Sequence, residues 1–158
     1  ALQVALAADD LSGAQRAAAT LTQAAVEFQP SEPRDAVRVW ETLARHLRMH
    51  GQQASDAASL EAIRAQLQPL TTQLLGVLRT FGNPTTAQLN LAYCPMAFDN
   101  QGAAWLQNGE SIDNAYFGTG MRTCGSVRAS VAPGGYLGPP PDDGVREERR
   151  APPAGHQH

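Results

Sequence analysis

The chain has 158 residues, of which 42% are hydrophobic, 6% aromatic and 17% charged, and its formal net charge is -3. This length fits one domain with a tail, and we expect no nucleic-acid partner because there is no surplus of positive charge to bind phosphate. No run reaches the roughly 18–20 apolar residues that cross a bilayer, so we expect no membrane span within this chain.

The first part of the sequence has the periodicity of amphipathic helices. Apolar residues recur at three- and four-residue steps over residues 2–28, and the stretch DDLSG at 9–13 predicts a capped break between two helical pieces. A turn with two prolines at 29–33 leads into a second predicted helix at 34–50, and Gly51 is expected to end it.

A third helix is predicted to start near Ser55 or Asp56 and to run to about Phe81. Pro69 lies inside it, so we expect a kink or a break at that position. Short connections make neighbouring helices antiparallel. The fold class we expect is therefore all-α, an antiparallel bundle of three or four helices.

The periodicity changes after the helices. Residues 88–93 alternate polar and apolar side chains like a short strand, and residues 126–131 are a second candidate strand that could pair with them. We expect three parts: a helical bundle at 1–83, a Cys/Met motif lobe at 84–131 packed on it in the same domain, and a tail at 132–158. The lobe should be small and loop-rich, with a short two-stranded ribbon.

Both ends of the chain suggest a larger context. The tail at 132–158 is rich in proline, glycine and charge, so we expect it to be extended, and either disordered or bound to a partner. Ala1 already lies within a helical pattern, which suggests a processed or partial chain and leaves room for a signal or membrane anchor upstream.

Sulfur is concentrated in the motif lobe. Cys94 and Met96 lie two positions apart, and Met121 and Cys124 lie three positions apart, in two segments that mirror each other. Thiolates and thioethers are soft ligands that select Cu(I), and by the same logic Ag(I), over hard cations. Four sulfurs from two segments could therefore form a site of three or four ligands.

A disulfide between Cys94 and Cys124 is the alternative to a metal site. On the chain-entropy estimate such a bond would stabilise the fold by roughly 3–4 kcal/mol, with Met96 and Met121 as core residues. Oxidation would also consume the thiolates that a metal needs. The spacing leaves both alternatives open.

The motifs "YCPMA", "AAWLQ", "IDNAYFG" and "GMRTCG", in this order, resemble the signature of a family of uncharacterised bacterial periplasmic domains. Members of that family occur alone and fused to periplasmic adaptor subunits of copper/silver efflux systems. The resemblance covers residues 1 to about 128 and implies that Cys94, Met96, Met121 and Cys124 are metal ligands. Ala115 departs from the family pattern, which usually has proline there.

Other side chains are weaker candidates. Trp105 could stack on a soft cation and Tyr116 could lie beside it, although each is also a typical core residue. His46 and His50, one helical turn apart with Met49 beside them, form a second, weak candidate metal site, and a solvated helix end explains them better.

Two functions follow from these observations. The first is a periplasmic domain that binds Cu(I) or Ag(I) in heavy-metal efflux or metal handling. The second is a structural subunit of a larger membrane-associated periplasmic complex, in which a Cys94–Cys124 disulfide staples the lobe and the tail wraps a neighbour. The sequence holds no Ser-His-Asp signature, phosphate-binding loop or CxxCH motif, so we do not expect an enzyme.

Overall fold

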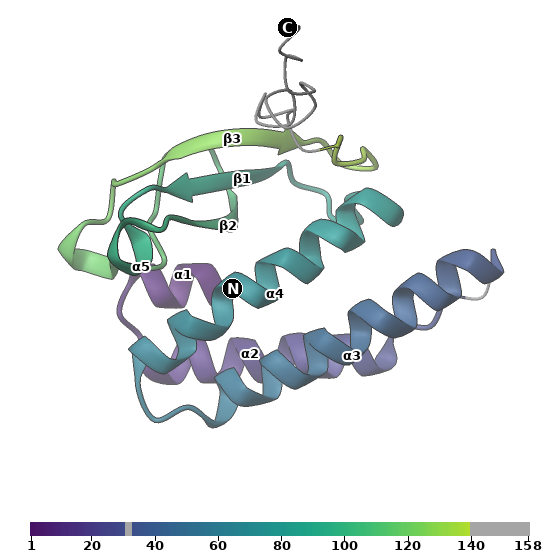
Figure 1. The fold of residues 1–158 in the computed structure, drawn as a ribbon, viewed down its shortest axis with the longest axis horizontal. Helices are drawn as coiled ribbons and strands as arrows, with labels where there is room; N and C mark the ends of the chain where they lie inside the picture. The colour runs from purple at the N-terminus through teal and green to yellow at the C-terminus, as the bar shows by residue number, and fades with distance from the viewer. Residues whose placement is uncertain (31–32, 140–158) are drawn as a thin grey trace, which may run out of the picture.

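The computed structural model describes residues 1–30 and 33–139 as a layer of helices covered on one side by a small sheet (Figure 1). The helices are α1 (Leu2–Ala7), α2 (Leu11–Glu27), α3 (Arg34–Asp56), α4 (Leu60–Thr80) and the short α5 (Ala97–Asn100). The strands are β1 (Leu89–Cys94), β2 (Ala103–Asn108) and β3 (Ser126–Val131), and a 3-10 turn, η1 (Gly118–Gly120), precedes β3.

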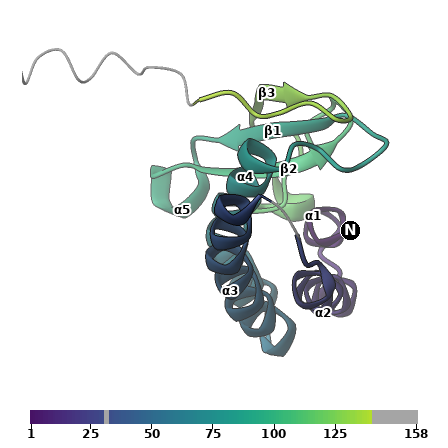
Figure 2. The ribbon, with the colours of Figure 1, turned by 90° about the vertical axis from the view of Figure 1, so that its right-hand side faces the viewer.

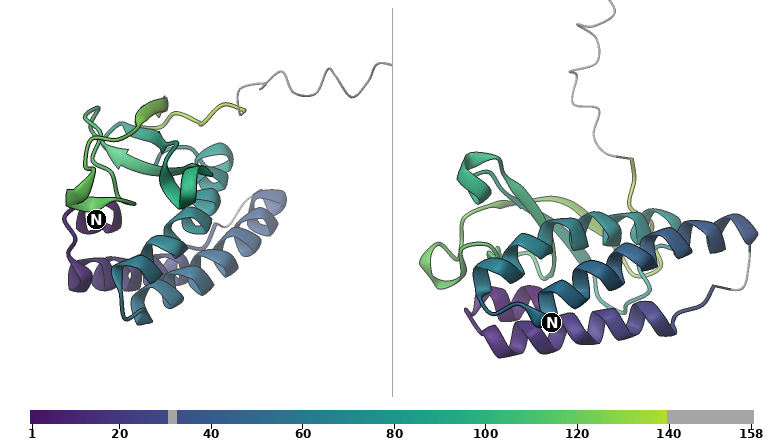
Figure 3. Two further views of the ribbon diagram at one scale, coloured as in Figure 1. Left: turned by 60° about the vertical axis from the view of Figure 1, so that its left-hand side comes forward. Right: turned by 60° about the horizontal axis from the view of Figure 1, so that its bottom comes forward.

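The helical layer is built on α3, which packs against both α2 and α4, and consecutive long helices run in opposite directions (Figures 1 and 3). Side-chain caps begin two of these helices, because Asp10 accepts from the backbone N–H of Gly13 and Ser59 accepts from that of Ala62. The predicted break between α1 and α2 is therefore present. Pro69 lies inside α4, which continues through it to Thr80.

The prediction that Gly51 ends the second helix is wrong. Helix α3 continues through Gly51 to Asp56, and Gly51 is buried against α2. A Cβ atom at this position would overlap the hydroxyl of Thr22, so the glycine allows the two helices to approach closely. The next helix accordingly begins at Leu60 rather than near Ser55.

The fold is not all-α, because the C-terminal lobe contains a three-stranded antiparallel sheet in the order β2-β1-β3. The predicted pairing of the first and last strands is present, with Tyr93 opposite Ser126 and Leu89 opposite Val131. The prediction of a two-stranded ribbon did not include β2. This strand pairs along the whole of β1, from Leu89 opposite Asn108 to Cys94 opposite Ala103.

The sheet lies over α4 and α1, and β2 is the strand that contacts both helices (Figure 2). One face of β2 supplies the fully buried Trp105, and β1 contributes the buried Ala92 and Cys94 to the same core. Lobe and helices therefore share one hydrophobic core. No helix in the described residues is long and apolar enough to cross a membrane.

The first residues of the predicted tail are bonded to the helical layer. The N–H of Leu137 donates to the carbonyl of Leu78, and Asn83 exchanges backbone hydrogen bonds with Gly134 and Gly135. The prediction of a disordered or partner-bound segment concerns mainly residues 140–158, which lie outside the described residues.

Candidate functional site

The two cysteines form a thiol pair at one end of the sheet. Cys94 is the last residue of β1 and is fully buried, whereas Cys124, two residues before β3, is partly exposed. Both are free thiols, and their Sγ atoms lie 3.1 Å apart. The antiparallel pairing of β1 with β3 brings together these two cysteines, which are 30 positions apart in the chain.

Gly125 allows Cys124 to lie this close to β1. Its backbone has φ of +133°, and a Cβ atom there would lie 2.8 Å from the carbonyl oxygen of Tyr93 and 3.1 Å from the Trp105 ring. Any larger residue would push the segment away from β1 and from the indole.

Asn114 holds the segment that carries Cys124, which we call the thiol loop (residues 114–124). Its side-chain amide donates to the carbonyl of Cys124 at 2.7 Å, and its backbone N–H donates to the carbonyl of Arg122. Its Oδ1 accepts from the backbone N–H groups of Tyr116 and Phe117 at 2.8 and 3.1 Å. One fully buried side chain therefore fixes both ends of the loop.

The contact between the thiols affects their protonation. The pKa of Cys124 is raised above its ordinary value, first by the hydrogen bond with Cys94, then by burial and by the charge of Cys94. Two thiolates this close repel each other, so a cation that binds both sulfurs would have to displace protons.

The two motif methionines occupy different positions from the thiols. Met96 is 45% exposed and lines a surface pocket together with Phe98, Tyr116, Phe117 and Arg64. Met121 is partly buried, and its backbone carbonyl accepts from the N–H of Cys124. The structure thus brings the two thiols together, with one methionine on each flanking turn.

Trp105 and Tyr116, the suggested neighbours of a metal, lie in the hydrophobic core that also contains Cys94. Trp105 is fully buried and donates to the side-chain oxygen of Gln107 at 3.0 Å. Tyr116 packs edge-on against Trp105, and its hydroxyl donates to the carbonyl of Ala104. Burial raises the pKa of the Tyr116 phenol above its ordinary value.

The three residues of the second suggested metal site, His46, Met49 and His50, have different surroundings in the structure. His50 is hydrogen-bonded through Nδ1 to Gln66 of α4 at 2.8 Å, and Met49 is 45% exposed. The Nδ1 atom of His46 is buried and has no hydrogen-bond partner among the residues that the structure describes. In residues 1–30 and 33–139, no three His, Cys, Asp or Glu side chains form a group that could hold a metal. The protein ligands of a metal at the thiol pair would therefore be the two thiolates, with thioethers or exogenous ligands completing any higher coordination, which suits a soft cation.

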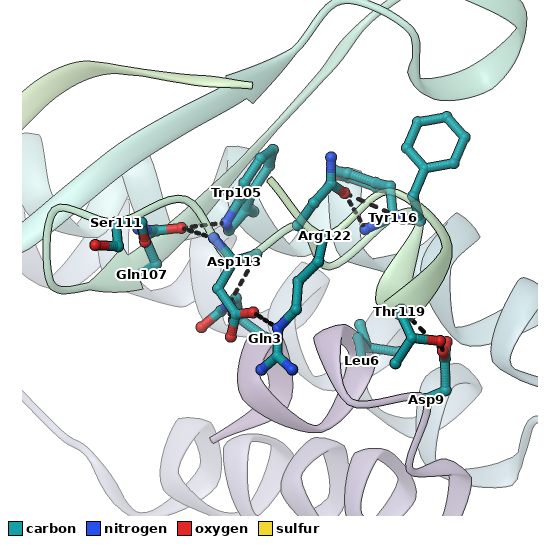
Figure 4. Close-up of polar contacts among 12 residues, drawn as sticks. Gln3, Leu6, Asp9, Trp105, Gln107, Ser111, Asp113, Tyr116, Thr119 and Arg122 are labelled. Atoms are coloured by element: carbon teal, nitrogen blue, oxygen red, sulfur yellow. Dashed lines mark hydrogen bonds and ion pairs between the residues drawn. The ribbon is translucent and has the colours of Figure 1, made fainter. Parts of the chain in front are cut away.

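Sequence reasoning missed the polar groups that attach the thiol loop to the helices. Asp9, between α1 and α2, forms an ion pair with Arg64 of α4 at 2.5 Å. It also accepts from the backbone N–H and the hydroxyl of Thr119 (Figure 4). Asp113, just before the loop, pairs with Arg122 at 2.5 Å and receives a hydrogen bond from Gln3. The positive φ of Asp9, +55°, has no signature in the sequence.

The hydrogen bonds from Thr119 and Arg64 hold the pKa of Asp9 well below its ordinary value of 3.8. A carboxylate whose pKa is lowered on folding stabilises the fold above its unfolded pKa, and this contribution is lost as the pH falls through the folded pKa. The free energy of unfolding of the wild type should therefore exceed that of Asp9→Asn most at neutral pH. Urea unfolding between about pH 7 and pH 2.5 measures it, and a difference that does not shrink below about pH 4 would contradict the assignment.

These features define a helical domain whose small sheet lobe holds a thiol pair. Residues 1–86, more than half of the chain, match the family described as "Protein of unknown function (DUF3347)", and the chain belongs to this family. The match covers helices α1 to α4 and ends before β1, so the thiol pair lies outside it. No curated protein and no solved structure shows significant similarity to the chain.

Proposed function

We propose that this protein is a periplasmic domain that binds a soft monovalent cation, Cu(I) or Ag(I), for heavy-metal efflux or metal handling. The observation that carries the proposal is the contact between Cys94 and Cys124, whose sulfurs lie 3.1 Å apart at the end of the sheet. Thiolates are the ligands that Cu(I) prefers. The link to efflux and the periplasm rests on the resemblance of the sequence motifs.

The proposed ligands have different roles. Cys94 is the buried, fixed ligand because it ends a strand, and Cys124 is the partly exposed ligand at which the cation would enter. Met96 and Met121, on the two flanking turns, would complete the coordination. No bond of a substrate is made or broken in this function, which is not that of an enzyme.

The same thiol contact favours a second function, in which the pair is oxidised to a disulfide that staples the lobe of a structural subunit. Forming that bond removes two electrons and two protons, and it leaves no thiolate for a metal. The two functions therefore predict opposite states of the cysteines in the protein as isolated.

Anaerobic titration of the reduced protein with Cu(I), against a chromogenic chelator, tests the proposal. We expect stoichiometric binding that is abolished in Cys94→Ser and Cys124→Ser and weakened about tenfold in Met96→Leu and Met121→Leu. Met49→Leu is a matched control, because Met49 is as exposed as Met96 but lies on α3.

Two results would count against the proposal. Failure of the wild type to compete for Cu(I), together with no free thiol before reduction, would favour the structural subunit. Equal Cu(I) affinities of Met49→Leu, Met96→Leu and Met121→Leu would show that the two thioethers are not ligands and that the site consists of the two thiolates.

A further inference from the structure

The thiol loop is attached to the helical layer at one polar cluster, which we call the loop anchor (Asp9, Arg64 and Thr119). Asp9 uses one carboxylate oxygen for Arg64 and the other for the N–H and hydroxyl of Thr119, at 2.9 and 2.5 Å. The Thr119 side of this cluster is visible in Figure 4. The anchor therefore joins the loop to the segment between α1 and α2.

Arg64 connects three separate segments. Its Nε donates to the carbonyl of Ala115 at 2.9 Å, and its Nη2 donates to the carbonyl of Leu6 at 2.9 Å and to Asp9. The Arg64 side chain is only 17% exposed, so these charge-assisted hydrogen bonds are partly shielded from water. The planar fork of a guanidinium is what allows one side chain to bind these groups together.

Close packing leaves the anchor little freedom. Gly118 has φ of +56°, and a Cβ atom there would overlap the Asp9 carboxylate and lie 2.6 Å from Nη2 of Arg64. The residues between Gly118 and Cys124 bury little surface, since Thr119, Gly120, Arg122 and Thr123 are exposed. The position of this half of the loop therefore depends on polar attachment more than on hydrophobic burial.

We propose that Asp9 and Arg64 are positioning residues for the thiol pair: through the loop anchor they keep Cys124 within reach of Cys94. Two residues of the part that matches the family thereby position a site outside it. The effect on metal affinity rests on the proposed function, whereas the effect on the thiols themselves requires no metal.

The test that needs no metal is the equilibrium of the protein with glutathione. When the Cys94–Cys124 bond forms, one glutathione disulfide is reduced to two glutathione thiols, so the equilibrium constant reports how well the two sulfurs are held together. Both carboxylate oxygens of Asp9 accept hydrogen bonds, so in Asp9→Asn the new NH2 group must face either Arg64 or Thr119, which are themselves donors. We expect the constant for disulfide formation to fall about tenfold, and Cu(I) affinity to fall by a similar factor.

Asp10→Asn is the matched control. It removes the same charge from the neighbouring residue, but Asp10 only caps α2 through Gly13, so both constants should stay at their wild-type values. Thr119→Val removes a single hydroxyl from an exposed position and keeps the backbone N–H. It should shift the glutathione equilibrium in the same direction by a smaller factor, while the fold stays intact.

The outcomes separate the two proposals. A wild-type glutathione constant in folded Asp9→Asn and Thr119→Val, even with lower stability, would overturn the positioning role. Equal losses in Asp9→Asn and Asp10→Asn would overturn it as well. If the wild type binds no Cu(I) but Asp9→Asn and Thr119→Val still weaken disulfide formation, the positioning role is supported and the metal function is wrong.

Discussion

Replacement of Asn114 with alanine is expected to destabilise the protein by about 3 kcal/mol and to separate the thiols. The side chain is fully buried and makes three hydrogen bonds to backbone groups of its own loop. Without it, the N–H groups of Tyr116 and Phe117 lose their acceptor and the carbonyl of Cys124 loses its donor. Urea unfolding of the reduced protein, together with Cu(I) affinity of the folded protein, would measure the two effects.

Asn114→Asp tests which of these bonds positions Cys124. It keeps an acceptor for the two N–H groups but places an oxygen where the amide donated to the Cys124 carbonyl at 2.7 Å. We expect a smaller loss of stability than in Asn114→Ala, with a comparable loss of Cu(I) affinity. Asn108→Ala, at the exposed end of β2, should change neither quantity. Wild-type affinity in Asn114→Asp would show that the bond to Cys124 does not place the thiol.

Periodicity predicted the helices because their apolar faces are continuous. It did not predict the end of α3, since a glycine at a helix crossing has the same sequence signal as a glycine that stops a helix. Only the overlap that a Cβ atom would have with Thr22 distinguishes the two cases.

Strand β2 was missed for a similar physical reason. Its inward positions alternate Ala103, Trp105 and Gln107, and the buried amide breaks the apolar pattern that identifies a strand. Gln107 is tolerated there because its amide is fully used. It accepts from Trp105 and Asp113 (Figure 4) and donates to the carbonyls of Gly109 and Ser111. That compensation exists only in the folded chain.

The sequence likewise predicted only part of the candidate site. Clustering of sulfur in the sequence was sufficient to select Cys94 and Cys124, which the sheet brings into contact. Asp9 and Arg64 lie at least 50 positions from the loop that they hold, and an isolated aspartate or arginine in a helical region carries no local signal. The ligand role of Met96 and Met121 stays a prediction.

Truncation of Trp105 is expected to have the largest effect on stability. The ring is fully buried, packs edge-on against Tyr116 and lies next to Gly125, so Trp105→Ala should leave a cavity beside the thiol loop. Loss of a buried tryptophan costs about 3–5 kcal/mol. Trp105→Phe keeps a ring but loses the N–H that donates to Gln107, and we expect a cost of about 1–2 kcal/mol. Urea unfolding of the reduced protein would measure both.

Trp40 is the control that separates an effect on stability from an effect on Cu(I) binding. It is 7% exposed and packs against Phe28 and Phe81 of the helical layer, with ring centroids 4.7 and 6.0 Å away. Trp40→Phe should lower the free energy of unfolding about as much as Trp105→Phe. Only Trp105→Phe should also weaken Cu(I) binding by the folded protein, because only this ring supports Gly125 and, through it, Cys124. Equal Cu(I) affinities of the two phenylalanine variants would mean that the loop keeps its position without the indole, and that Asn114 and the loop anchor suffice to hold it.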